Sequence, residues 1–174
     1  MKQFHYFVYQ KYIDLHVISA FEAITQYMGC LKCKKISRYI HWTIDLDTDL
    51  DQEQFINNIM ENSYYLINPN KQLVTQTLPV INDDGQYSVN VSVSSKLDSE
   101  QDVLVEKLNQ FCGNDIQSIK QRTIWNCMID ESSYEQAQDY VYSNLVRSSE
   151  NTGIFLNPIY QDYCFVDGNG FVIQ

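Results

Sequence analysis

The segment Phe155-Leu156-Asn157-Pro158-Ile159-Tyr160-Gln161-Asp162-Tyr163-Cys164-Phe165 resembles an earlier one in the same chain, Leu66-Ile67-Asn68-Pro69-Asn70-Lys71-Gln72-Leu73. In both places a helical pattern ends, an Asn-Pro pair turns the chain, and a short apolar run follows. The residues upstream also correspond, because the offset between Trp42 and Trp125, 83 residues, is close to the 84 residues between Gly29 and Gly113. The sequence therefore predicts that one structural unit occurs twice.

Hydrophobic periodicity predicts the order strand, helix, strand, helix, strand in each unit. The first helix of the first unit is predicted to pack on the core through a helical stripe made by Leu15, Ile18, Phe21, Ile24 and Met28. The first helix of each unit runs into a glycine, Gly29 or Gly113, as a left-handed helix end prefers. Asp51 with Gln54, and Ser132 with Glu135, have the spacing of a capping box at the second helix. The predicted segments are 4–9, 14–28, 40–46, 51–60 and 73–78 in the first copy, and 87–94, 99–111, 123–129, 132–141 and 162–166 in the second.

The boundary between the predicted units is Asn82-Asp83-Asp84-Gly85, an Asp-Gly turn of the hairpin type. The units are therefore residues 1–81 and 82–174, and the hairpin indicates that they share a sheet. A unit of about 80 residues buries a marginal core, and fusion supplies its partner within one chain. The predicted fold class is α+β, with two tandem β-α-β-α-β units of the ferredoxin-like kind, pseudo-twofold, whose antiparallel sheets are covered by helices.

Charge and hydropathy limit the functional classes. The net charge is −10, and most of the acidic excess lies after Ile81, which argues against a nucleic-acid footprint. The basic cluster of Lys32, Lys34, Lys35 and Arg38 has two interpretations, a solvated edge or a contact to an anionic ligand or partner. No stretch is apolar enough to suggest a membrane span or a signal peptide, so we expect a cytoplasmic protein.

Reactive groups do not form a recognisable catalytic pattern. The chain has 5 cysteines, for which free thiols are the default in a cytosolic protein, and the C-x-x-C at Cys30 and Cys33 has no second ligand pair. The acidic run from Asp45 to Asp51 lacks the glycine and glutamate of a calcium loop. The sequence indicates no catalytic residue, no cofactor and no metal ligand, and an independent enzyme is the least favoured class.

The duplicated unit resembles the PurS family, the small subunit of phosphoribosylformylglycinamidine synthase. The second copy carries Ile116-x-x-Ile119 with Arg122, and Leu156-Asn157-Pro158-Ile159 with Tyr163; the first keeps Ile36, Arg38, Tyr39, Ile40, Asn68 and Pro69. Both copies lack the Gly-Lys pair that the family commonly has at the entry to the central strand. The resemblance implies a PurS-like fold, here as two units in one chain.

For function, the resemblance implies a non-catalytic subunit in de novo purine biosynthesis. It would bridge a PurQ-type glutaminase and a PurL-type, ATP-dependent synthetase, and it leaves further self-association open. The candidate interface residues are Arg38, Tyr39, Trp42, Asn68, Pro69, Arg122, Trp125, Asn157, Pro158 and Tyr163.

Two alternatives stay open at this stage. The chain could be a regulatory module that binds a small metabolite between its copies, with Tyr39, His41, Tyr64 and Tyr65 lining the site. The two tryptophans could line a ligand pocket, although a large aromatic residue in the middle of a strand more often anchors a core or a subunit contact.

Overall fold

The computed structural model describes residues 1–49, 51–57, 63–80, 82–83, 85–97, 101–112, 115–147 and 153–173. The strands are β1 (Lys2–Gln10), β2 (Cys33–Asp47), β3 (Gln72–Thr75), β4 (Asn82–Asp83), β5 (Gln86–Ser95), β6 (Asp115–Asp130) and β7 (Gln161–Val166). The helices are α1 (Leu15–Glu22), α2 (Gln52–Phe55), α4 (Gln101–Cys112) and α5 (Tyr134–Val141). Two π-helical turns, Ala23–Tyr27 and Tyr142–Val146, extend α1 and α5.

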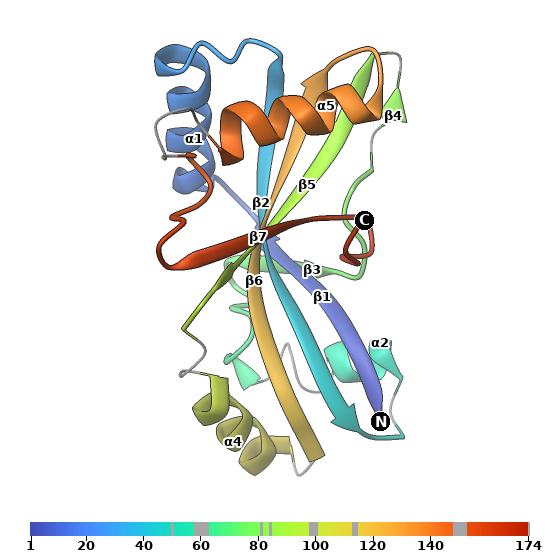
Figure 1. Ribbon diagram of the computed structural model, residues 1–174. Helices are drawn as coiled ribbons and strands as arrows, with labels where there is room; N and C mark the ends of the chain where they lie inside the picture. Colours follow the sequence, from blue (N-terminus) through green and yellow to red (C-terminus); the bar gives the residue numbers. More distant parts are fainter. Residues whose placement is uncertain are drawn as a thin grey trace.

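All seven strands belong to one antiparallel sheet with the order β3-β1-β2-β6-β5-β4, and β7 also pairs with β5. The centre of the sheet is the pair β2 and β6, which are 15 and 16 residues long and lie antiparallel from Cys33↔Ile129 to Asp47↔Asp115. Figure 1 shows these two strands running the length of the molecule. Strands in globular proteins are usually about 5–6 residues long, and the greater length of this pair lets it carry one group of helices at each end of the molecule (Figure 1).

The predicted fold class is therefore wrong in its architecture, although α+β describes the chain. The structure is one continuous sheet and not two tandem β-α-β-α-β units with sheets of their own. The physical reason is the length of β2 and β6: the predicted central strands, 40–46 and 123–129, form only part of each. β4 does pair antiparallel with β5, but the two halves share the sheet through β2 and β6.

The packing of the helices also crosses the predicted boundary at residue 81. The π-helical turn after α1 packs through Ile24 with Val141 of α5 in one core cluster, and Phe55 of α2 packs with Leu108 of α4 in another. In Figure 1, α1 and α5 lie at one end of the sheet, and α2 and α4 lie at the other. Each core thus combines helices from both halves of the chain, and the division into units 1–81 and 82–174 stays a prediction.

The opposite face of the sheet carries a third, smaller cluster made by Phe7, Tyr39, Leu78, Ile124 and Val166. After β7 the chain turns at Asp167 and folds back, with Val172 bridged to Val166. None of the helices in the described ranges combines the length and apolarity that crossing a bilayer requires.

Local signals in the sequence were accurate where the structure describes them. Asp51 and Gln54 form the predicted capping box, and Gly29 has a positive φ of 66° after the first helix. The second cap lies one residue later than predicted, because Ser133 rather than Ser132 accepts the hydrogen bond that begins α5. Three predicted features lie outside the described residues: the start of the helix 99–111 at Ser99, the glycine end at Gly113, and the helical positions Ile59 and Met60.

Candidate docking groove

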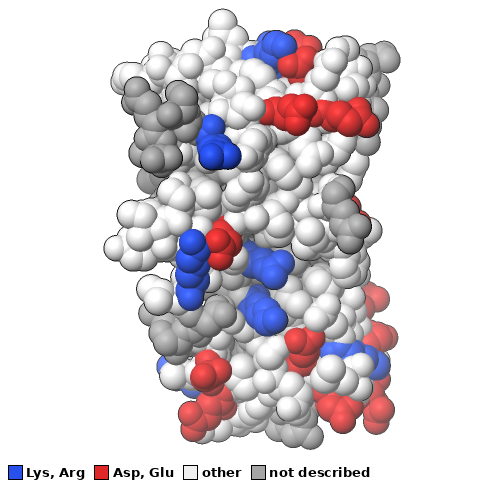
Figure 2. All heavy atoms as spheres, viewed as in Figure 1, with Lys and Arg blue, Asp and Glu red and all other residues white. Residues whose placement is uncertain are grey.

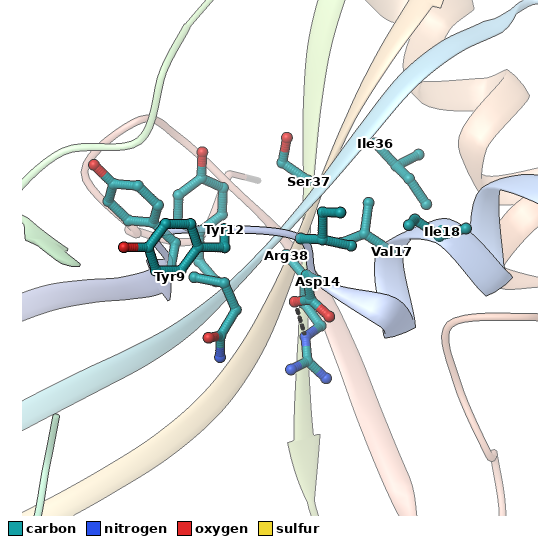
Figure 3. A pocket seen from close by; sticks show the side chains of 11 residues that line it. Tyr9, Tyr12, Asp14, Val17, Ile18, Ile36, Ser37 and Arg38 are labelled. Atoms are coloured by element: carbon teal, nitrogen blue, oxygen red, sulfur yellow. Dashed lines mark hydrogen bonds and ion pairs between the residues drawn. The ribbon is translucent and has the colours of Figure 1, made fainter. Parts of the chain in front are cut away.

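The first half of the molecule contains a surface hollow of about 280 Å³ at the point where β1 separates from β2. β1 pairs with β2 as far as Val8↔Ile40 and then continues beside β3. The chain next enters α1, so the hollow is lined by β1, β2 and the start of α1 (Figure 3). The residues that matter for its chemistry are Tyr9, Tyr12, Val17, Ile18, Ile36 and Arg38.

A second hollow of about 290 Å³ continues the first along α1. The two share Val17, Ile18 and Ile36 as lining residues, so together they form one groove between α1 and the outer edge of β2. We call this the α1 groove. Within the described residues, no strand pairs with β2 on this edge between Cys33 and Tyr39.

An ion pair holds the two walls of the α1 groove together. The Asp14 carboxylate caps α1 by accepting from the His16 N–H at 2.9 Å, and it accepts from Arg38 Nε at 3.1 Å. Both side chains are largely buried. Figure 3 shows this pair between the start of α1 and the strand. Arg38, one of the predicted interface residues, therefore lies in the groove with its charge already satisfied.

Large apolar side chains at and before the start of α1 are exposed to solvent, and Tyr12, Ile13 and Ile18 among them line the first hollow. Around the start of α1, Tyr12 is 81% exposed, Ile13 73%, Leu15 73% and Ile18 43%. We call these four residues the α1 apolar row. Exposed apolar side chains that gather in one place, unlike single ones, mark interaction sites.

The α1 apolar row contradicts part of the sequence analysis. The sequence predicted Leu15, Ile18, Phe21, Ile24 and Met28 as a core stripe, but of these only Ile24 is buried. The helix faces the core instead through Val17, Ala20, Phe21 and Ile24, which have the spacing of one helical face. The sequence does indicate a second apolar surface, because residues 12–24 contain more apolar side chains than one buried helical face requires.

The basic cluster forms a charged edge next to the groove. Lys32 pairs with Glu131, and Lys34 pairs with Asp130 at 3.4 Å. Lys35 is exposed and makes no ion pair with a described residue. Figure 2 shows Lys and Arg interspersed with Asp and Glu on the visible face, with several acidic side chains toward the end that carries α2 and α4.

The two Asn-Pro turns have the same local structure, although neither lies in the α1 groove. The Asn68 side chain accepts from the Asn70 N–H and the Asn157 side chain from the Ile159 N–H, each at 3.1 Å. In both turns the asparagine N–H donates to a glutamine four residues later, at 2.8 Å. The Pro69 carbonyl accepts a hydrogen bond from Lys11, and the Pro158 carbonyl accepts one from Lys96. Pro158 and Tyr163 also line a separate hollow of about 330 Å³.

The predicted tryptophans are core residues. Trp42 is 6% exposed and donates from Nε1 to the Leu66 carbonyl at 3.0 Å. Trp125 is 9% exposed and stacks on Phe155 with centroids 4.7 Å apart. Leu66 and Phe155 each precede an Asn-Pro turn by two residues, so the two tryptophans have corresponding surroundings. The interpretation as a core anchor is confirmed, and neither ring presents a free surface for a partner.

Arg122 lies apart from Arg38. In the register of β2 and β6, Arg122 is opposite His41, whereas Arg38 is opposite Trp125. Because successive side chains of a strand alternate between faces, the two arginines lie on opposite faces of the sheet. A shift of one residue in matching the two halves of the sequence is enough to cause this difference.

The metabolite site predicted as an alternative does not form. Tyr39 and His41 are buried on the face opposite to the Trp42 core, and Tyr64 and Tyr65 are exposed in the turn that leads to Leu66. Leu66 belongs to the core on the other face of the sheet. The sheet thus separates the two pairs of residues, and we do not propose this site.

Two histidines that the sequence analysis did not pair stack on the same face as Tyr39. His5 Nδ1 and His41 Nε2 are 3.1 Å apart, and the ring of Phe7 stacks on His41 at 4.6 Å. His41 is 1% exposed, and its Nδ1 has no hydrogen-bond partner among the residues that the structure describes. Burial, with smaller effects from His5 and Arg122, lowers the pKa of His41 to about 3. Both rings are therefore neutral near pH 7, because burial lowers the pKa of His5 as well.

Four of the cysteines that the structure describes have free thiols, as the sequence predicts. Cys30, Cys33, Cys127 and Cys164 are free, and the first three are buried. Burial, and to a lesser extent the neighbouring Cys30, raises the pKa of Cys33 to about 12. A thiol with so high a pKa is a poor nucleophile at neutral pH.

Comparison with protein-family models, with curated protein sequences and with solved structures gives no match to this chain.

Proposed function

We propose that this protein is a non-catalytic subunit that binds another protein through the α1 apolar row. The more specific form of the proposal follows the PurS resemblance. In that form the partners are the glutaminase and synthetase subunits of the phosphoribosylformylglycinamidine synthase complex, which this chain bridges in the cytoplasm for purine biosynthesis.

The observation that carries the proposal is the exposure of Leu15 and Ile18 beside the α1 groove. A helix in a small protein normally turns its apolar residues to the core, and α1 has already done so with Val17 and Phe21. The exposed side chains of Leu15 and Ile18 bury little apolar surface in the fold itself. Covering one such side chain in an interface would contribute roughly 1.5–3 kcal/mol.

Rigid attachment makes this surface suitable for docking. The Asp14–Arg38 pair fixes the start of α1 to β2, and the apolar side of the helix packs on the core around Ile24. The row is therefore held in place before a partner arrives, which reduces the entropy that binding costs. A bridging subunit needs such a preformed surface because its contribution to a complex is geometric.

The test is co-elution in size-exclusion chromatography of the tagged protein with purified synthetase and glutaminase, in the presence of glutamine and Mg-ADP. We expect the wild type to co-elute, and we expect Leu15→Asp to weaken binding by roughly 10–100-fold. Leu15 is the first residue of α1, where an acidic side chain is favourable for the helix, so the variant should fold.

The control is Val103→Asp, an exposed apolar position on α4, which should co-elute as the wild type does. Absence of co-elution for the wild type would reject the purine complex as the assembly. Equal binding by wild type and Leu15→Asp would reject the α1 apolar row as the docking surface.

A further inference from the structure

We infer that the α1 groove binds an extended, acidic segment of a partner protein, which adds as a strand to the free edge of β2. This inference rests on the proposed function, because it names the kind of segment that the docking surface accepts. The expected occupant of the α1 groove is an added strand and not a helix or a small molecule.

The first reason is that no described strand pairs with the outer edge of β2 between Cys33 and Tyr39. Between Cys33 and Tyr39, β2 pairs with β6 on one side, and β1 joins its other side only from Ile40 onward. In an antiparallel sheet, every second residue of such a stretch points its N–H and C=O away from the existing partner. Those groups form a template for a further strand.

The second reason is a contrast with the other central strand. β6 also extends beyond its outer neighbour, because β5 ends its pairing at Val93↔Thr123. There the α4 side chain of Asn109 occupies the edge at one residue: it accepts from the Ile116 N–H and donates to the Ile116 carbonyl, each at 2.9 Å. The comparable polar side chain beside β2 is Thr25, in the turn that extends α1. Its hydroxyl donates to the Phe21 carbonyl of its own helix and not to the backbone of β2.

The third reason is the shape of the groove. An added strand would turn alternate side chains toward the helix, over Val17, Ile18 and Ile36, which line both hollows. The close-up in Figure 3 shows these three residues between the strand and the helix. The segment is therefore expected to be apolar at alternate positions.

The fourth reason is charge. Lys34 and Lys35 line the second hollow from the strand side, and Lys35 makes no ion pair with a described residue. Glu22 lines the same hollow from the helix side. An acidic side chain in the segment is thus favoured over β2 and disfavoured over α1.

The experiment is selection of a random twelve-residue peptide library, displayed on phage, against the intact protein. We expect the enriched peptides to alternate apolar and polar residues and to carry Asp or Glu. A synthetic copy of an enriched peptide should bind at least tenfold more weakly to Ile18→Glu and to Lys35→Glu. Lys120→Glu, a charge reversal on the corresponding half of β6, should bind as the wild type does.

Failure to enrich alternating acidic peptides, or equal binding by all three variants, would overturn the inference. Amide hydrogen exchange gives a second measurement. The amides of residues 34–39 that face away from β6 should exchange quickly in the free protein and slowly with the peptide bound. Slow exchange of all of them in the free protein would show that the edge is already covered.

These outcomes separate the inference from the proposed function. If Leu15→Asp releases the synthetase and glutaminase while the library yields no strand peptide, the docking surface stands and the added strand is wrong. If strand peptides bind but neither subunit co-elutes, the strand site stands and the proposed assembly is wrong.

Discussion

Acidification should destabilise this protein through His41 before most carboxylates titrate. The ring is 1% exposed, stacks on Phe7, and lies so close to Gly170 that a Cβ there would come within 2.8 Å of it. Its pKa in the folded protein is about 3, against 6.5 for an unperturbed histidine. At any pH between these values the unfolded chain binds more protons than the folded one, so stability falls as pH falls below 6.5.

The magnitude follows from the two pKa values. Each pH unit within that window costs about 1.4 kcal/mol, so lowering the pH from 7 to 5 should remove about 2 kcal/mol through His41. For a chain of this size the loss corresponds to a fall in Tm of roughly 4–8 °C. His5 acts in the same direction, because burial lowers its pKa too, although Asp45 and Asp167 oppose this.

The assay is urea unfolding at pH 7 and pH 5, followed by circular dichroism, for three proteins. His41→Phe keeps a flat ring against Phe7 but cannot titrate, so its loss between the two pH values should be smaller than that of the wild type by about 2 kcal/mol. His16→Gln changes an exposed histidine of α1 and should behave as the wild type does. If His41→Phe lost as much stability as the wild type, the account of the buried pair would be wrong.

Three further predictions concern the cap of α1, the two core tryptophans and the two Asn-Pro turns. Asp14→Ala should reduce the free energy of unfolding by about 1–2 kcal/mol, because it removes the cap of α1 and the partner of Arg38. The control Asp162→Ala removes an exposed ion pair with Lys96 and should change the free energy of unfolding by less than about 0.5 kcal/mol. Trp42→Ala and Trp125→Ala should each cost about 3–5 kcal/mol in urea unfolding, and a cost below about 1 kcal/mol for either would contradict its assignment to the core. Asn157→Ala should destabilise the chain by about 1 kcal/mol through the lost turn contact to Ile159, and Asn68→Ala should do the same; unchanged Tm values for both would remove the structural role of the two turns.

The local elements of the fold could be predicted from the sequence because their signals are short-range. The cap at Asp51, the glycine after the first helix and the two Asn-Pro turns each depend on a few neighbouring residues. The length of β2 and β6 could not be predicted in the same way. Residues 33–39 alternate poorly, because Lys34 and Lys35 interrupt the pattern at a bulge between Cys33 and Lys35, and so the pairing of the two halves along their full length was missed.

The candidate site shows a similar division. Arg38 was selected from its motif and does lie in the α1 groove, but Trp42 and Trp125 were selected for their size and prove to be core residues. The sequence pattern assigned Leu15 and Ile18 to the core, since periodicity identifies an apolar helix but not which of two apolar faces is buried. That choice depends on which strands the helix packs against, and only the three-dimensional structure supplies it.

The most direct test of the docking surface is hydrogen-exchange mass spectrometry of the protein alone and in its reconstituted assembly with the synthetase and glutaminase. If the α1 apolar row is the interface, backbone amides of residues 12–18 should become protected in the assembly, while those around Val103 should not change. Protection confined to other segments, such as the turn at Pro158, with residues 12–18 exchanging as they do in the free protein, would contradict the proposal.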